Sequence, residues 1–357
     1  MKRPYYIFSS GRLGRRQNTL LLERKTETQA PSADPVAPVA EPKVERLPFP
    51  VEQVESLYVF GEVDINTKLI TFLAQNAIPV FFFDYYGNYT ATLYPREPIL
   101  SGRLRVEQVR HYLNKKCRLI IARAFVDAAV FNILRVLKYY ATRTSGLAEE
   151  GILAAIEGIE SERSTLADAR DVPTLMGAEG RSRDLYYRAW PHILGSEAAA
   201  FPFDKRERRP PSNEINALIS FGNALCYSGV LRQIYRTALD PTVSYLHEPG
   251  DRRFSLALDV SEVFKPLLVD RGIFRLIKNR EITPRHFEER LGGVYLNESG
   301  RRRFVEHWDE RMKATIKHRR LGRNVSYERL IRLECYRLVR HLSDPKNDPY
   351  KPFKMWW

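Results

Sequence analysis

The chain has 357 residues, of which 44% are hydrophobic, so it can form one or two domains with a sizeable core. Its 57 Lys and Arg residues exceed its 43 Asp and Glu residues, which gives a formal net charge of +14. This balance favours a polyanionic partner, most simply a nucleic acid, with an anionic membrane surface as the alternative. No apolar run approaches the roughly 18 residues that span a bilayer, and the apolar stretch at the N-terminus is too short for a secretory signal.

Residues 1–97 are predicted to form a small β-rich domain. Short strand candidates occur at residues 5–10 and 18–24, and stronger ones, dense in Val, Phe, Tyr and Thr, occur at residues 57–65 and 79–95. A Gly-Arg pair at residues 11–12 is interpreted as a turn, and residues 67–77 have helical spacing. Residues 28–45 are rich in Pro and Ala and poor in aromatic residues, so we interpret them as a flexible, dispensable insertion.

Residues 98–103 contain Pro and Gly and are interpreted as a linker to a larger domain. Residues 104–343 show amphipathic helical patterns at residues 105–144, 149–166, 179–194, 213–239, 258–279 and 326–343. The tail, residues 344–357, is too Pro-rich to be helical, and its terminal tryptophans are expected to dock on a neighbouring surface or to anchor a partner. The predicted fold class is therefore α+β, a β-rich domain followed by an all-α domain.

The three cysteines, Cys117, Cys226 and Cys335, are far apart and odd in number. They form neither a CxxC pair nor a disulfide framework, which argues against a structural zinc site and favours the reducing cytoplasm. We expect them to be buried free thiols.

Two acids and a histidine lie near each other in the sequence. Asp259 and Glu262 share one face of a predicted helix, in which Pro266 is expected to cause a kink or to start a new helix. His247 precedes a Glu-Pro-Gly turn that can fold its imidazole back over the start of this helix. Imidazole and carboxylate ligands suit Mn²⁺ or Mg²⁺. The alternative is a solvated acid pair and a loop histidine.

A further acid, Glu179, is flanked by Gly177 and Gly180, which allow close approach of the backbone. The alternative for Glu179 is an acid at a helix N-terminus that complements the helix dipole.

Four segments, "MGAEGRSRDLYYRAW", "RRPPSNEINALISFGNALCY", "LDPTVSYLHEPGDRRFSLALDVSEVFKPLLVDR" and "SYERLIRLECYRLVRHL", resemble in order and spacing the CRISPR-associated protein one family. The N-terminal segment "ESLYVFGEVDINTKLITFLAQNAIPVFFFDYYG" shares the resemblance, which spans nearly the whole chain apart from residues 28–45. The resemblance implies a small β domain, a larger helical domain, and a metal-dependent DNA endonuclease and integrase that acts in CRISPR spacer acquisition, an antiviral defence.

Carried over by motif, the resemblance implies that Glu179, His247 and Glu262 are the catalytic metal ligands, and that Asp259 is a supporting acid. The metal would be Mg²⁺ or Mn²⁺. The implied reaction is transesterification, in which the 3′-hydroxyl of a short DNA fragment attacks a phosphodiester at the edge of a CRISPR repeat. The chain departs from the family at Asn223, where an aromatic residue is frequent, and after Gly180, where small residues are common.

The same resemblance implies binding to double-stranded and branched DNA, a homodimer and a complex with CRISPR-associated protein two. From the cysteine usage and the hydropathy we expect a cytoplasmic location and no membrane partner. Two other functions remain open at this stage. One is a metal-dependent nuclease that acts on branched DNA in repair, and the other is a catalytically silent architectural protein that binds DNA.

Two segments carry a strong excess of basic residues. Residues 301–341 contain 13 Lys and Arg against five Asp and Glu, and residues 103–143 contain ten against two. Solvated helix faces are one explanation, and a phosphate-contacting surface is the other. The candidate DNA-binding residues are Arg208, Arg209, Arg301, Arg302, Arg303, Lys317, Arg319 and Arg320. Three histidines, His307, His318 and His341, are interpreted as phosphate or surface contacts rather than metal ligands.

Overall fold

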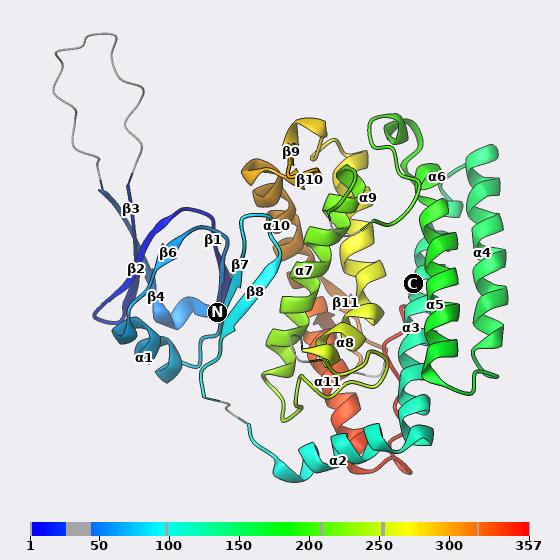
Figure 1. Cartoon of the computed structure of the whole chain (residues 1–357), viewed down its shortest axis with the longest axis horizontal. Coiled ribbons are helices and arrows are strands. Elements are labelled where there is room, and N and C mark those ends of the chain that lie inside the picture. The colour runs from blue at the N-terminus through cyan, green and yellow to red at the C-terminus, as the bar shows by residue number, and fades with distance from the viewer. Residues whose placement is uncertain are drawn as a thin grey trace. The chain divides into compact units, whose positions relative to one another are not determined.

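The computed structural model describes residues 2–25, 44–96, 99–207, 210–250, 254–319 and 321–356. The chain divides into two compact units, Met1–Pro98 and Ile99–Trp357 (Figure 1). The first unit is rich in β-strands and the second is mainly helical, which confirms the predicted α+β fold class.

The first unit contains two four-stranded sheets and one helix. One sheet has the order β1-β5-β7-β8 and the other β4-β3-β2-β6. In the first sheet β1, β5 and β7 are parallel and β8 is antiparallel to β7. Apolar side chains from both sheets and from α1 form the core, among them Leu20, Leu57 and Leu69. The elements are β1 (Arg3–Ile7), β2 (Gly11–Arg16), β3 (Thr19–Lys25), β4 (Val44–Pro50), β5 (Val54–Val59), β6 (Val63–Asp64), α1 (Thr67–Gln75), β7 (Val80–Phe83) and β8 (Tyr89–Leu93).

Two segments of this unit differ from the sequence-based prediction. Residues 11–12, predicted as a turn, begin strand β2, which pairs with β3 along its length. Residues 44–45, assigned to the flexible insertion, begin strand β4, where Glu45 accepts a hydrogen bond of 2.6 Å from Arg24. Both β2 and β4 pair with β3, and this pairing makes residues 11–12 and 44–45 part of a sheet although their own sequence does not indicate a strand. The rest of the insertion, residues 28–43, lies outside the described residues.

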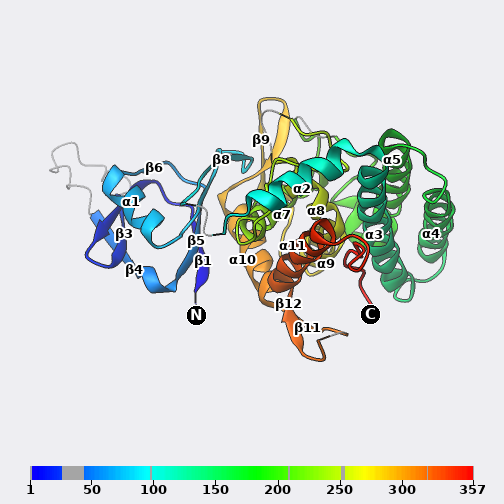
Figure 2. The same cartoon turned by 90° about the horizontal axis from the view of Figure 1, so that it is seen from below.

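The second unit is built around long helices (Figures 1 and 2). Helices α3, α4 and α5 pack side by side, and α8 packs between α3 and α7. The helices are α2 (Gly102–Leu113), α3 (Lys115–Ala141), α4 (Leu147–Thr165), α5 (Val172–Arg188), α6 (Trp190–Leu194), α7 (Glu214–Ile234), α8 (Ser255–Lys265), α9 (Arg271–Lys278), α10 (Glu298–Lys313) and α11 (Tyr327–Ser343). Two antiparallel hairpins join them, β9 (Phe287–Arg290) with β10 (Gly293–Leu296), and β11 (Thr315–Lys317) with β12 (Asn324–Ser326).

The boundaries of this unit follow local chemistry. Helix α2 begins at Gly102, because the hydroxyl of Ser101 accepts a hydrogen bond from the Leu104 backbone N–H at 3.2 Å. Residues 102–103, predicted as linker, are therefore helical. At Pro266 a π-helical segment, Pro266–Asp270, joins α8 to α9. The missing N–H of proline accounts for this break in the regular α-helical pattern.

The tail docks onto the helical unit without forming a helix. The buried amide of Asn132 on α3 donates to the Phe353 carbonyl at 3.2 Å and accepts from the Met355 backbone N–H at 2.8 Å. The carboxylate of Glu334 on α11 accepts from the Tyr350 hydroxyl at 2.7 Å and from the Phe353 backbone N–H at 2.9 Å. Buried polar groups that are satisfied in this way fix the path of the tail.

Of the two terminal tryptophans, Trp356 docks on a neighbouring surface, since its ring lies 5.6 Å from that of His318 and 5.3 Å from that of Phe353, centroid to centroid. Trp357 lies outside the described residues. Among the thiols, Cys226 and Cys335 are buried and Cys117 is partly exposed, and all three are free. Among the residues that the structure describes, no helix is both long enough and apolar enough to cross a membrane.

Candidate active site

Helix α5 carries Glu179 in its middle. The helix begins at Val172, where the Asp171 carboxylate accepts a hydrogen bond from the Thr174 backbone N–H at 2.8 Å. Glu179 is therefore two turns inside the helix, and the alternative of an acid at a helix N-terminus is wrong. One turn further on, Arg183 lies on the same face and donates to the Glu179 carboxylate.

Helix α8 carries both Asp259 and Glu262, and neither is solvated. Asp259 is fully buried and Glu262 is 7% exposed. The alternative of a solvated acid pair is therefore wrong. Buried carboxylates require partners, because an ionised group that lacks them costs several kcal/mol in a protein interior. The two acids have different partners, and this gives them different roles.

Asp259 holds the segment that carries His247. Its carboxylate accepts hydrogen bonds from the backbone N–H groups of Tyr245 at 2.7 Å, Leu246 at 2.9 Å and His247 at 3.0 Å. The same carboxylate lies 2.8 Å from Nδ1 of His247. Because an ionised carboxylate only accepts, Nδ1 carries the proton and Nε2 carries the free lone pair. Asp259 thus fixes the position and the tautomer of the imidazole.

Glu262 lies between two cations. Arg183 donates to one of its oxygens, and Lys265 lies 2.5 Å from the other. Burial would raise the pKa of Glu262, but the charges of Arg183 and Lys265 lower the pKa to about 2. Burial would likewise lower the pKa of the Arg183 guanidinium, but Glu262 and Glu179 raise it well above its usual value. The carboxylate of Glu262 is therefore ionised at neutral pH.

Arg183 connects α5 to α8, since it bridges Glu179 and Glu262. The structure thus places three of the predicted site residues on α5 and α8, which Arg183 connects, with His247 on the turn before α8. Sequence reasoning missed Arg183 and Lys265. The signal was present, because Arg183 follows Glu179 by four residues and Lys265 follows Glu262 by three.

The donor atoms fit a hard divalent cation. Two carboxylates and an imidazole with a free Nε2 form a ligand set typical of Mg²⁺ or Mn²⁺. Both carboxylates already face one buried positive charge, that of Arg183. Within the described ranges, no group of three or more His, Cys, Asp and Glu side chains is arranged to hold a metal ion. This absence of a preformed metal site agrees with the ion pairs in which both glutamate carboxylates bind Arg183.

One more buried acid lies close to this site. Asp270 ends the π-helical segment and is 2% exposed. Burial, together with the charge of Glu262 and against the opposing charges of Arg183 and Lys265, raises the pKa of Asp270 to about 7. The sequence did not single out Asp270, because only the fold brings the charge of Arg183 near it.

The candidate DNA-binding residues occupy different environments. Arg301 is 7% exposed, so a phosphate contact there would require neighbouring side chains to move. Arg302 pairs with Glu298 at 2.5 Å, and Arg303 lies 3.3 Å from Glu306. Lys317 is on β11, and Arg319, which is exposed, donates to the Trp356 carbonyl at 3.3 Å. The remaining three, Arg208, Arg209 and Arg320, lie outside the described residues.

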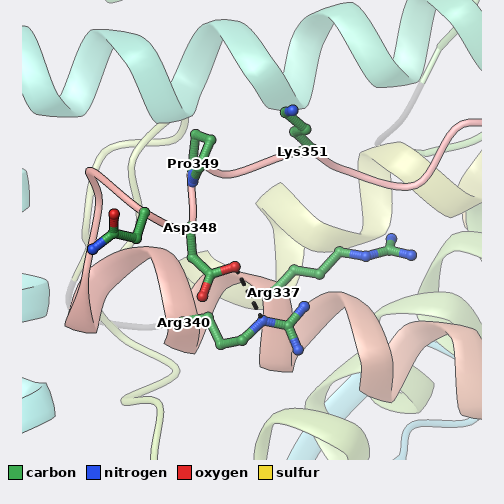
Figure 3. A pocket seen from close by; sticks show the side chains of 6 residues that line it. Arg337, Arg340, Asp348, Pro349 and Lys351 are labelled. Atoms are coloured by element: carbon green, nitrogen blue, oxygen red, sulfur yellow. Dashed lines mark ion pairs between the residues drawn. The ribbon is translucent and has the colours of Figure 1, made fainter. Parts of the chain in front are cut away.

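A basic hollow of about 150 Å³ lies where the tail crosses α11 (Figure 3). Arg337 and Arg340 project from α11, and Asp348 and Lys351 come from the tail. Arg340 Nε lies 3.9 Å from the Asp348 carboxylate. This ion pair is exposed and weak, and it adds little to the docking of the tail.

Solved structures share this fold across the whole chain. A CAS1 protein from Thermotoga maritima has a TM-score of 0.81 and 36% sequence identity, and the match covers 99% of this chain and all of that one. A casposase bound to an integration product has a TM-score of 0.80 at 19% identity, over all of this chain and 95% of that one. The fold is therefore that of the Cas1 and casposase structures.

The sequence comparisons identify the family within this fold. Residues 5–310 match the family model "CRISPR associated protein Cas1". The CRISPR-associated endonuclease Cas1 3 of Thermodesulfovibrio yellowstonii is 44% identical over 99% of this chain and all of its own length. The CRISPR-associated endonuclease Cas1 2 of Moorella thermoacetica is 45% identical over the same shares. The chain belongs to the Cas1 family, which confirms the resemblance seen in the sequence.

Proposed function

We propose that this protein is a divalent-metal-dependent DNA endonuclease and integrase that inserts short DNA fragments into a CRISPR repeat array. The observation that carries the proposal is the pairing of Glu179 and Glu262 through Arg183, with His247, whose imidazole Asp259 orients, on the turn before α8. Curated relatives of the chain are named as CRISPR-associated endonucleases. The fold shared with a casposase bound to an integration product is compatible with strand joining as well as cutting.

The chain's own residues account for binding and orientation. Glu179 and Glu262 supply carboxylate oxygens and His247 supplies Nε2 as ligands. Arg183 and Lys265 keep Glu262 ionised, so that it remains a ligand at neutral pH. A bound Mg²⁺ or Mn²⁺ would polarise the phosphoryl oxygen and stabilise the leaving oxyanion. In the reaction, a bond forms between the attacking 3′-oxygen and phosphorus, and the bond to the leaving 3′-oxygen breaks.

We also propose a homodimer that assembles with a Cas2 protein on double-stranded and branched DNA. Solved assemblies of this fold include a Cas6-RT-Cas1–Cas2 complex, to which this chain is 17% identical with a TM-score of 0.79. This likeness supports the proposal through the fold alone. The excess of basic residues on the chain is compatible with a DNA partner.

The decisive experiment is a strand-transfer assay. A labelled DNA fragment with free 3′ ends is incubated with a repeat-containing plasmid and Mg²⁺ or Mn²⁺, with and without a Cas2 partner. We expect metal-dependent joining by the wild type and none by Glu262→Ala or His247→Ala, while both variants bind DNA nearly as the wild type does. Wild-type turnover in either variant would contradict the ligand assignment.

The same assay separates the two alternatives. Metal-dependent cutting of branched DNA without joining, even with the partner present, would favour a repair nuclease. Salt-sensitive DNA binding without any reaction would favour an architectural protein. The exposed Glu306 on α10 offers a matched control, because Glu306→Ala removes a carboxylate outside the cluster.

A further inference from the structure

A second hollow, of about 310 Å³, lies between the C-terminal end of α3 and helices α9 and α10. Glu179, His247 and Glu262 are not among its lining residues, so it is separate from the candidate active site. Its volume is at the lower end of the roughly 300–1,000 Å³ range of small-molecule sites. Five of its lining side chains are cations: Arg143, Arg271, Arg275, Lys278 and Arg311.

Several of these cations are bound to neutral groups. Arg143 donates to the Tyr139 carbonyl at 2.9 Å, and Lys278 donates to the Ile193 carbonyl at 2.9 Å. Arg311 donates to the Tyr327 hydroxyl at 2.9 Å. Carbonyls and hydroxyls hold a cation in place and leave its charge uncompensated. These three side chains therefore keep a positive charge that a bound anion could neutralise.

The electrostatics of Arg311 reflect this excess of positive charge. Burial lowers the pKa of Arg311, and the nearby charges of Arg271 and Arg275 lower it further. One carboxylate, Glu281, lies 3.9 Å from Arg275, and it also lies 3.5 Å from Arg303. Among the described residues that line the hollow none is acidic, so the electrostatic potential there is positive.

Tyrosine rings position the cations. The guanidinium carbons of Arg143 and Arg271 lie 3.8 Å and 4.6 Å from the centroid of the Tyr139 ring. Nζ of Lys278 lies 5.6 Å from the centroid of the Tyr140 ring. Such contacts hold a guanidinium in place, so that less side-chain entropy is lost when a ligand binds.

A buried imidazole completes the lining. His307 is 6% exposed, and its Nδ1 has no hydrogen-bond partner among the described residues. A buried polar atom without a partner costs free energy unless a ligand or water satisfies it. The imidazole is close to Gly272 of α9, where an added Cβ would lie 3.2 Å from its ring. Burial, together with the charges of Arg275 and Arg311 and against that of Glu281, lowers the pKa of His307 to about 4.

We propose that this hollow binds the phosphate groups of a nucleotide. Guanidinium groups match phosphate oxygens as paired donors, and an uncharged imidazole adds one N–H donor. The tyrosine rings offer surfaces to a sugar or a base. A free nucleoside triphosphate and the successive phosphates of a nucleic-acid strand share this chemistry. The proposal does not depend on the reaction at the candidate active site.

Binding is tested on the full-length chain with a fluorescent ribose-labelled ATP and no divalent ion. We expect saturable binding that Lys278→Ala and Arg275→Ala each weaken roughly tenfold, because each removes one charged donor. Both side chains are exposed, so folding should be preserved. The matched control is Arg329→Ala, which removes an exposed positive charge on α11 outside the hollow and should leave the affinity unchanged.

Displacement of the probe distinguishes the two sources of phosphate. More efficient displacement by ATP would assign the hollow to a free nucleotide, and more efficient displacement by a short single-stranded DNA would assign it to a strand. Either result supports a phosphate site. Absence of saturable binding, or equal weakening by Arg329→Ala, would overturn the proposal.

A second readout locates the ligand. In a protein with labelled histidines, tripolyphosphate should shift the His307 resonance, which is identified among the seven histidines by its loss in His307→Gln. The expected direction is a rise in the pKa of His307, because a bound anion stabilises the imidazolium. A His307 resonance that stays fixed while others move would place the anion elsewhere and contradict the proposal.

Discussion

Asp259 shows how one buried carboxylate can organise a metal-binding site without itself binding the metal. It accepts hydrogen bonds from three consecutive backbone N–H groups and lies beside Nδ1 of His247. Carboxylates that orient a metal-binding imidazole fix its tautomer and increase its basicity. The sequence placed Asp259 near the site, and the structure shows the contacts through which it acts on His247.

The substitution Asp259→Asn tests this role. The amide retains one acceptor oxygen and presents an NH₂ group toward N–H donors, so the turn and the imidazole should lose their fixed geometry. We expect Mn²⁺ affinity, measured by calorimetry, to fall by about 10–100-fold. Glu306→Gln, an exposed carboxylate on α10, is the control. Unchanged affinity in Asp259→Asn would show that His247 is not a ligand or does not need this support.

The acid stability of the second unit tests the environment of Glu262. Its pKa falls from 4.5 to about 2 on folding, which corresponds to about 3 kcal/mol of stabilisation at neutral pH. Because the folded-state pKa is the lower one, this contribution is present above pH 4.5 and is lost as the pH falls toward 2. The free energy of unfolding of Glu262→Gln should therefore lie below that of the wild type at pH 7 and approach it in acid.

Tryptophan fluorescence suits this measurement, because all four tryptophans belong to the second unit. Denaturant unfolding is followed at a series of pH values. The exposed Glu306→Gln should run parallel to the wild type at every pH. Parallel curves for Glu262→Gln as well would mean that its carboxylate gains no stabilisation from Arg183 and Lys265.

The order of the sequence motifs predicted the candidate site residues. It did not predict the cations that pair with them. The segments around Glu179, His247 and Glu262 have a distinctive residue composition and order. Arginine and lysine are common on any basic helix, so their presence alone does not identify an ion-pair partner. Only the packing of α5 against its neighbours brings Arg183 to Glu262, which is 79 residues away in the sequence. The five cations of the second hollow escaped notice for the same reason.

At the scale of elements, the sequence predicted helices that have strong amphipathic periodicity. It did not predict a polar strand that depends on pairing with a neighbouring strand. The helical spacing of residues 67–77 matches α1, and the long amphipathic run of residues 105–144 matches α2 and α3. Strand β2 has one buried side chain, Leu13, among arginines, so it depends on β3 for its order. Helix α10 was missed because charged residues surround its buried Phe304, Trp308 and Met312.

The docking of the tail is testable through Phe353. Its ring is 1% exposed and stacks on Phe264 of α8, with 5.6 Å between centroids. Phe353→Ala should cost roughly 3–5 kcal/mol, because it removes buried apolar contact and leaves a cavity beside α8. Denaturant unfolding measures this cost, and Leu147→Ala, at a residue that is 82% exposed, should change little. A small effect of Phe353→Ala would show that the tail does not stay docked in solution.

At the scale of the whole molecule, charge is the property most directly linked to a DNA partner. The excess of basic residues recurs in two segments that are far apart in the sequence, residues 103–143 and 301–341. Part of this charge is internally compensated, as in the pairs of Arg302 with Glu298 and Lys138 with Glu160. The uncompensated remainder determines how many phosphates the protein can neutralise, and the ionic strength dependence of DNA binding measures that number.

We therefore expect DNA affinity to fall steeply with salt. Each neutralised phosphate contributes about 0.9 to the slope of log K against log salt, so six to ten contacts would reduce affinity roughly 10³–10⁵-fold between about 50 and 200 mM salt. The measurement is a fluorescence anisotropy titration of labelled duplex at several salt concentrations.

Glu262→Ala should leave this slope unchanged, because its carboxylate is not a phosphate contact, whereas removal of an exposed cation in the DNA-binding surface should lower it by about one unit. Arg319→Ala tests one such candidate and Arg12→Ala, an exposed position on β2 of the first unit, is the matched control. A flat salt response in the wild type would mean that the net charge of +14 is not used to bind DNA, and it would contradict the proposed partner.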